Sequence, residues 1–292
     1  STSLIEPRKK PNSTTMLSRL SPRLLSSSPH LLSSSIRTLV NVTYPSPSVA
    51  VLELDRPPVN SLSLEMATSI TSHIKQIESD PKIRSLILTS SNPKIFSAGL
   101  DITEMSRPSK SRLSDFWRSV QSLFLALYST RLSTVACISG HSPAGGCLLS
   151  MSCDYRVMSS DPGLGIGLNE TRLGIAAPYW LKDLFVKTVG WREGELGLSL
   201  GKLYCPEEAF KIGLVDEIVE GEVVYEVAVE RAEEYAKIPE KGIVATKRMC
   251  RGELVRDLEG KIEEDVGWFT EFILEEGTQK GIEGYLKSLS KK

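Results

Sequence analysis

The architecture of this chain is easiest to read in residues 85–101, SLILTSSNPKIFSAGLD. Residues 85–89 form an apolar run typical of a strand buried on both faces. A polar loop over residues 92–96 leads into the small residues SAG (97–99), where a backbone can approach a ligand closely. The turn therefore has two interpretations, a tight strand-to-helix connection or one wall of a binding site.

Strand and helix signals alternate on both sides of this stretch. Residues 50–54 alternate as a strand does, and residues 64–77 place apolar side chains three and four apart, on one helix face. The order strand, helix, strand, helix, strand, helix, strand predicts an α/β architecture with crossover units. The later elements are a helix over 116–128, strands over 134–138 and 154–158 flanking a helix over 147–153, a short helix opened by Pro206, a strand over 214–219 and a nearly all-helical region over 223–289.

A second glycine turn, GHSPAGG (140–146), also follows a strand and opens a helix. A helix N-terminus presents free N–H groups and a positive dipole end. Glu170 comes next, within GLNETRLGI (167–175). Two turns that aim N–H groups and one carboxylate are a minimal set for moving a proton beside a carbonyl. The N–H groups would hold an enolate oxygen, and the carboxylate would carry the proton.

Composition excludes several classes of function. The 292 residues carry a formal net charge of −1, so no general nucleic-acid partner is indicated. No apolar run approaches the ~20 residues of a membrane span, so we expect no stable membrane insertion. The five cysteines include no CxxC pair and the histidines number three, which argues against a zinc site. We expect no metal and no separate cofactor.

The N-terminal segment has a different composition from the rest. Between Met16 and Asn41 the chain has three arginines, eight serines and no acidic residue. This composition is typical of an organelle transit peptide. The alternative is a disordered tail with no targeting function. We therefore predict that residues 1–45 lie outside the fold and direct the chain to the mitochondrial matrix.

Five stretches of the chain belong together as a set of motifs: PVNSLSLE (58–65), FSAGLD (96–101) with Glu104-Met105, PAGGC (143–147), CDYR (153–156) and GLNET (167–171). In this order they resemble the enoyl-CoA hydratase/isomerase (crotonase) family over about residues 46–290. A further stretch, PYWLKD (178–183), is similar to the mitochondrial isomerases of that family.

The resemblance implies a spiral of ββα units over residues 46–222 and a helical C-terminal region over 223–292 that packs in homotrimers. It implies an acyl-CoA thioester as the substrate, with coenzyme A belonging to the substrate. Carried over by position, the catalytic residue is Glu170, and the backbone N–H groups of Leu100 and Gly145 form the oxyanion hole. The substrate-binding residues would be Ala98, Gly99, Leu100, Asp101, Ile102, Gly145 and Asn169.

The number of carboxylates separates the reactions of this family. Its hydratases use two glutamates, and the position of one of them is occupied here by Leu148, which cannot hold or deprotonate water. Glu170 alone suffices for a 1,3-proton shift, so the resemblance favours a Δ3,Δ2-enoyl-CoA isomerase. The alternatives are another acyl-CoA enzyme of the family, such as a hydratase or thioester hydrolase, and a non-catalytic acyl-CoA-binding subunit. Asp101 and Asn169 each have a second interpretation as a cap or loop residue.

Overall fold

Apolar strands build a mostly parallel sheet. The computed structural model describes residues 38–289. Six strands lie in the order β1-β2-β3-β4-β6-β8, with β1 antiparallel to β2 and all other neighbours parallel. The strands are β1 (Val40–Ser46), β2 (Val49–Leu54), β3 (Ser85–Ser90), β4 (Ser133–Ile138), β6 (Tyr155–Ser159) and β8 (Glu217–Val219).

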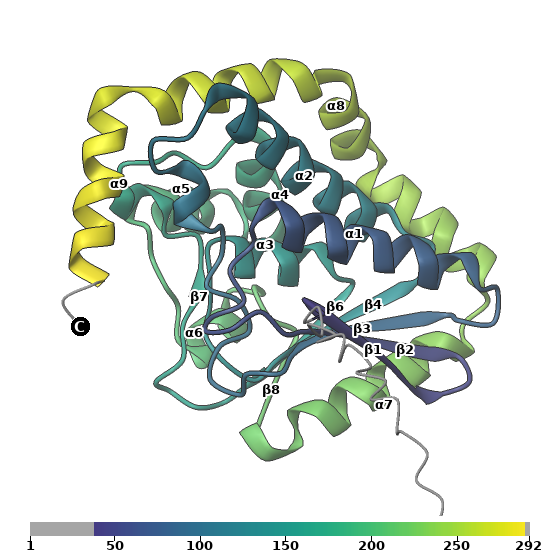
Figure 1. Ribbon diagram of the computed structural model, residues 1–292. Coiled ribbons are helices and arrows are strands. Elements are labelled where there is room, and N and C mark those ends of the chain that lie inside the picture. The colour runs from purple at the N-terminus through teal and green to yellow at the C-terminus, as the bar shows by residue number, and fades with distance from the viewer. Residues whose placement is uncertain (1–37, 290–292) are drawn as a thin grey trace, which may run out of the picture. The chain divides into compact units, whose positions relative to one another are not determined.

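Both faces of the sheet are covered, because successive side chains of a strand point to opposite faces. Val51, Ile87 and Val135 belong to the apolar cluster that includes Ala228 of helix α7 (Val224–Lys237). The alternating neighbours, such as Leu88, belong to the larger cluster beneath α1 and α2. Figure 1 shows α7 on one side of the sheet and α1 and α2 on the other.

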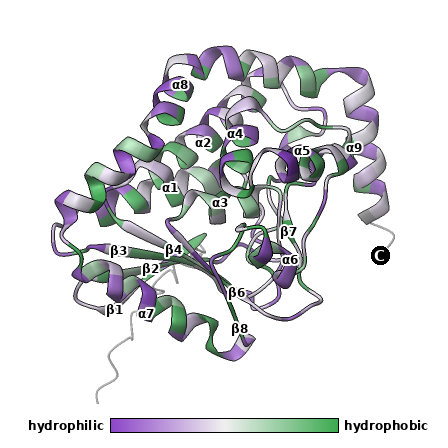
Figure 2. Cartoon of the chain, turned by 180° about the vertical axis from the view of Figure 1, so that it is seen from behind, coloured by the Kyte–Doolittle hydropathy of each residue, from purple (hydrophilic) through white to green (hydrophobic). Residues whose placement is uncertain are grey.

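The remaining helices cover the larger cluster and extend it. Helix α1 begins after Ser63, whose side chain accepts a hydrogen bond from the Met66 N–H. The apolar residues of α1 lie on one face of the helix, and this face packs inward. Figure 2 shows hydrophilic and hydrophobic residues alternating along the helices. The helices are α1 (Leu64–Ser79), α2 (Lys110–Ser129), α3 (Gly145–Ser152), α4 (Tyr179–Val189), α5 (Trp191–Leu200), α6 (Pro206–Lys211), α7, α8 (Glu240–Leu274) and α9 (Glu276–Leu289).

The α/β architecture and the helical C-terminal region predicted from the sequence are confirmed. Beyond β8 the described chain is helical, with α7 against the sheet and α8 against α2. Within residues 38–289, no helix has the length and apolar composition that a membrane crossing requires. The predicted transit peptide lies almost wholly outside the described residues.

Three predictions of secondary structure need correction. The fold begins before residue 46, because Val40–Ser46 forms β1 and pairs with β2. Helix α2 starts at Lys110 rather than 116, where the Ser109 side chain accepts from the Arg112 N–H. Helices α4 and α5 were not predicted. They are separated at Gly190, whose φ of +86° interrupts the helical pattern.

Candidate active site

The two glycine turns touch each other. Gly99 has a φ of +93°, and a Cβ there would lie 2.8 Å from the backbone nitrogen of Gly145. A Cβ on Gly145 would lie 3.1 Å from the backbone nitrogen of Leu100. Position 99 therefore requires glycine by conformation and by space, and position 145 favours it by space. The backbone nitrogens of Leu100 and Gly145 are thereby neighbours.

Both of these N–H groups are available to a ligand. Leu62 donates to the Gly99 carbonyl at 2.8 Å and accepts from the Asp101 N–H at 3.0 Å, which fixes the backbone on both sides of Leu100. Among residues 38–289, the Leu100 N–H itself has no backbone acceptor. Gly145 is the first residue of α3, where an N–H has no partner within the helix. The adjacent N-cap, Ala144, has a φ of +49°, an uncommon conformation of the kind that clusters at functional sites.

A short second sheet brings Glu170 to these turns. Strand β5 (Ser142–Pro143) pairs in parallel with β7 (Ile166–Gly167). The Ala144 N–H donates to the Gly167 carbonyl at 2.8 Å. The 3-10 helix η2 (Glu170–Leu173) begins three residues later, so its first side chain is delivered beside the second turn.

A cavity of about 240 Å³ lies against these segments. It is lined by six of the residues predicted from the sequence, whereas Gly99 and Gly145 are not among its lining residues. Its other walls are mostly apolar, which suits a ligand with a hydrophobic chain. The predicted residues that line it are Ala98, Leu100, Asp101, Ile102, Asn169 and Glu170, and the apolar side chains include Val59, Met105, Trp117, Leu173, Ile175, Leu181 and Phe269.

Several cavity residues could not be identified from the sequence. Trp117 and Phe269 come from α2 and α8, and Leu181 comes from α4. Their signal is apolar helical periodicity, which is shared by every residue packed in a core. Trp117 carries one further signal, because a buried indole N–H requires an acceptor.

Glu170 has an ionisable side chain without a partner. Among the described residues, no cation pairs with its carboxylate and no other side chain donates to it. Burial raises the pKa of Glu170 to about 7, opposed only by a hydrogen bond from its own backbone N–H. A carboxyl group that titrates near neutral pH can take up a proton and give it back.

Asp101 lines the same cavity, but its negative charge is balanced by neighbouring groups. Its carboxylate accepts from the Thr103 N–H at 3.1 Å and the Thr103 hydroxyl at 2.6 Å, and pairs with Arg56 at 2.6 Å. Burial acts to raise the pKa of Asp101, but the Thr103 and Arg56 contacts outweigh it and hold this pKa below its usual value. Asp101 is the N-cap of the 3-10 helix η1 (Ile102–Met105), as its cap interpretation predicts.

Asn169 and Leu148 have different relations to the site. Asn169 occupies the N-cap position of η2 without a side-chain cap bond and lines the cavity beside Glu170. Leu148 lies in α3, is 2% exposed and does not line the cavity. Position 148 therefore supplies no carboxylate to the site. Leu148 belongs to the core and is not part of the cavity wall.

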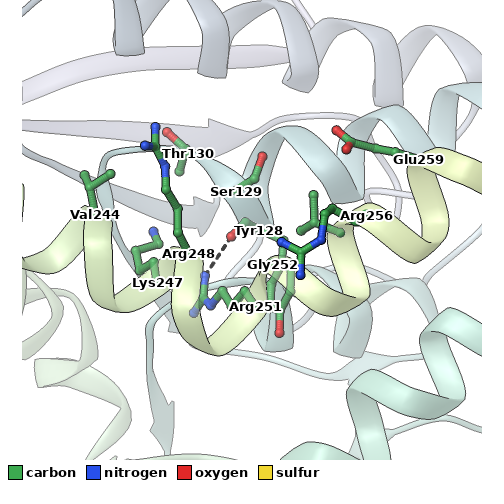
Figure 3. Close-up of a pocket in the computed structure, with 11 residues that line it drawn as sticks. Tyr128, Ser129, Thr130, Val244, Lys247, Arg248, Arg251, Gly252, Arg256 and Glu259 are labelled. Carbon is green, nitrogen blue, oxygen red and sulfur yellow. Dashed lines mark hydrogen bonds between the residues drawn. The ribbon is translucent and has the colours of Figure 1, made fainter.

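A larger hollow, of about 360 Å³, lies where α8 passes the C-terminal end of α2 (Figure 3). Two of its four basic side chains, Lys247 and Arg251, are engaged in structure. Lys247 and Arg251 pair with Asp154 at 2.9 and 2.7 Å, and Arg251 also donates to the Tyr128 carbonyl at 2.9 Å. These contacts attach α8 to the core, and this hollow has no reactive group comparable to Glu170.

Comparison with known proteins identifies the family of the chain. A family model described as Enoyl-CoA hydratase/isomerase matches residues 45–291. The mouse protein named "Enoyl-CoA delta isomerase 1, mitochondrial" is 45% identical over 256 residues, covering 88% of each chain. The human protein of the same name is 43% identical over 241 residues, covering 82% of this chain and 80% of its own length.

Solved structures share the fold. The crystal structure of human mitochondrial delta3-delta2-enoyl-CoA isomerase has a TM-score of 0.85 and 42% sequence identity, covering 87% of this chain and 98% of that one. An enoyl-CoA hydratase from Bacillus halodurans has a TM-score of 0.76 at 24% identity, covering 84% and 99%. The crotonase-like fold expected from the sequence motifs is thus confirmed.

Proposed function

The chain belongs to the enoyl-CoA hydratase/isomerase family, and we propose that it acts as an enoyl-CoA delta isomerase on unsaturated fatty acyl-CoA thioesters. The double bond of a 3-enoyl-CoA moves to the trans-2 position, as the β-oxidation of unsaturated fatty acids requires. The observation that carries the proposal is a lone, half-buried carboxylate that lines a mostly apolar cavity together with Leu100, whose N–H is free to bind a ligand.

Glu170 acts first as the base and then as the acid. Its carboxylate takes a proton from C2, the double bond shifts from C3–C4 to C2–C3, and the protonated carboxyl returns the proton at C4. The negative thioester oxygen of the dienolate is held by the N–H groups of Leu100 and Gly145. One such donor typically contributes ~3–4 kcal/mol to transition-state stabilisation.

The same cavity residues hold the substrate. The loop of Ala98, Gly99, Leu100, Asp101 and Ile102 contacts the thioester and its coenzyme A portion, and Asn169 orients the reacting carbons. The proton that leaves C2 is returned at C4, so the reaction needs no metal and no cofactor beyond the coenzyme A of the substrate itself.

The chain acts in mitochondria, in the matrix. The mouse and human relatives are both named mitochondrial, and residues 16–41 have the composition of a transit peptide. Because β1 begins at Val40, the test is deletion of residues 1–37 rather than 1–45. The truncated protein should fold and remain active but stay in the cytosol, whereas cytosolic location of the tagged full-length chain would contradict the assignment.

The active form is a homotrimer. Large apolar side chains remain exposed on the described chain, among them Trp191 (69%), Leu200 (63%) and Phe210 (51%), and such surfaces often mark subunit contacts. Light scattering should give a mass three times that of one chain.

The direct test of the activity separates isomerisation from hydration. The protein is incubated with 3-hexenoyl-CoA and, separately, with trans-2-hexenoyl-CoA. We expect conjugation of the first and negligible hydration of the second. Efficient hydration, or release of free coenzyme A, would instead identify a hydratase or a thioester hydrolase, and binding without turnover would identify an acyl-CoA-binding subunit.

A further inference from the structure

The closed end of the cavity is an aromatic wall. Trp117 of α2 and Phe269 of α8 stack with ring centroids 3.7 Å apart and planes 8° from parallel. Both line the cavity and both are 2% exposed, with Leu181 beside them at 4%. Tyr285 lines the same cavity but is 39% exposed. Exposed lining residues such as Tyr285 and Ala176 therefore mark the open side of the cavity, and the stacked pair lies at the buried end.

A buried carboxylate fixes this wall. Asp265 of α8 is 3% exposed, and its Oδ2 accepts from the Trp117 indole at 2.8 Å, the Gln121 amide at 2.7 Å and the Trp180 indole at 3.1 Å. No cation in residues 38–289 forms an ion pair with it, so these N–H donors offset the cost of burying the group. Rotation of Trp117 would remove one of them, which holds the ring in place.

The cavity is small for a fatty acyl ligand. Its volume of about 240 Å³ is below the roughly 300–1,000 Å³ of typical ligand pockets. Once the reacting carbons lie beside Glu170, only a short chain fits before it meets the stacked rings. A longer chain has to displace aromatic side chains whose orientation is fixed by Asp265.

We propose that the Trp117–Phe269 pair, positioned by Asp265, sets the upper limit of acyl chain length in this enzyme. The proposal rests on the isomerase function, and it adds the residues that determine specificity. Trp117 and Phe269 would contact the substrate, whereas Asp265 would act only through the ring that it holds.

The test compares chain lengths within one variant. The kcat/KM values for 3-dodecenoyl-CoA and 3-hexenoyl-CoA are measured for the wild type and for Phe269→Ala, and their ratio is taken. The fraction of folded enzyme cancels in this ratio. Removing the ring should raise the ratio by at least ~10-fold, the effect expected for relieving a steric limit in an apolar pocket. Phe269→Leu, a milder change, should shift it in the same direction.

Phe272→Ala is the matched control. Phe272 lies one turn further along α8 and lines an open groove with Leu173 and Gly281 rather than the Glu170 cavity. The kcat/KM ratio of the Phe272→Ala variant should equal that of the wild type. An unchanged ratio in both Phe269 variants would overturn the proposal. So would a rise in Phe272→Ala, because the chain would then leave through the groove.

Asp265 is tested by two variants. Asp265→Asn keeps an oxygen acceptor for the indole N–H and should retain the wild-type ratio. Asp265→Ala removes the acceptor and should raise the ratio as Phe269→Ala does. Equal ratios in Asp265→Ala and the wild type would remove Asp265 from this role. Failure of the wild type to convert 3-hexenoyl-CoA would contradict the isomerase function itself, which is a separate outcome.

Discussion

Glu170 and Asp101 line the same cavity, but the protein surrounds their carboxylates in opposite ways. Asp101 is held by Thr103 and Arg56, and its pKa lies below the usual value. Within residues 38–289, Glu170 has no partner beyond its own backbone N–H, and burial raises its pKa to about 7. The difference lies in the partners and not in the position, because both groups face the same space.

This contrast indicates which carboxylate can carry a proton. A carboxylate that already accepts several hydrogen bonds gains little by binding a proton at neutral pH, so it serves as a fixed charge. A buried carboxylate without partners is close in energy to its protonated form, so it can exchange protons with a substrate. The comparison assigns Asp101 to structure and Glu170 to chemistry.

The largest effect is expected for Glu170→Gln. Glutamine keeps the shape of the side chain but cannot accept the C2 proton. Turnover of 3-hexenoyl-CoA should fall by at least ~10²–10⁴-fold, while the affinity for acyl-CoA, measured by calorimetry, should change little because the backbone donors remain. A variant that keeps more than a tenth of the wild-type turnover would show that another group is the base, with Asp101 the first to examine.

Leu148→Glu adds a carboxylate at a buried position without partners. Because Leu148 is 2% exposed and does not line the cavity, the new group should lower the free energy of unfolding by ~2–4 kcal/mol. It should not produce an efficient hydratase, since a second carboxylate must be aimed at the water to within about 0.5 Å. Thermal unfolding and hydration of trans-2-hexenoyl-CoA are the two measurements. Rapid hydration would mean that this position does reach the reacting carbons.

Asp101→Asn should have the smallest effect on turnover, less than ~10-fold. It should instead reduce stability by ~1–2 kcal/mol, because Arg56 loses its charged partner. The folded-state pKa of Asp101 is below the ordinary 3.8, so this stabilisation is present above about pH 4 and lost in more acidic solution. Urea unfolding should therefore show a larger difference in stability between the two proteins at pH 7 than at pH 3.

Much of this organisation could be predicted from the sequence, because local patterns encode it. The buried strand at residues 85–89 and the small residues after it identify the first turn. The contact between the turns requires glycine at position 99 and favours it at position 145. The presence of glycine at both positions is therefore a sequence signal for this contact. Glu170 could be assigned only from the family motif, since a glutamate in a loop is by itself uninformative.

The rest depends on contacts between distant segments. Asp265 accepts a hydrogen bond from Trp117, which lies 148 residues away in the sequence, and no local pattern at either residue indicates this contact. The two-stranded sheet β5–β7 has only two residues per strand, too few for a periodic signal. Composition places most of β1 in the N-terminal segment of residues 1–45, because an edge strand next to a basic, serine-rich segment has no sharp compositional boundary.

The most direct test of the central claim, that burial makes Glu170 the proton carrier, is the pH dependence of kcat/KM for 3-hexenoyl-CoA. This quantity reports the ionisation of the free enzyme. With the pKa of Glu170 at about 7, kcat/KM should fall about tenfold per pH unit below that value, in the wild type and in Asp101→Asn alike. A profile that stays flat from pH 8 to pH 5 would contradict the account, because it would mean that the base has the pKa of an ordinary exposed carboxylate.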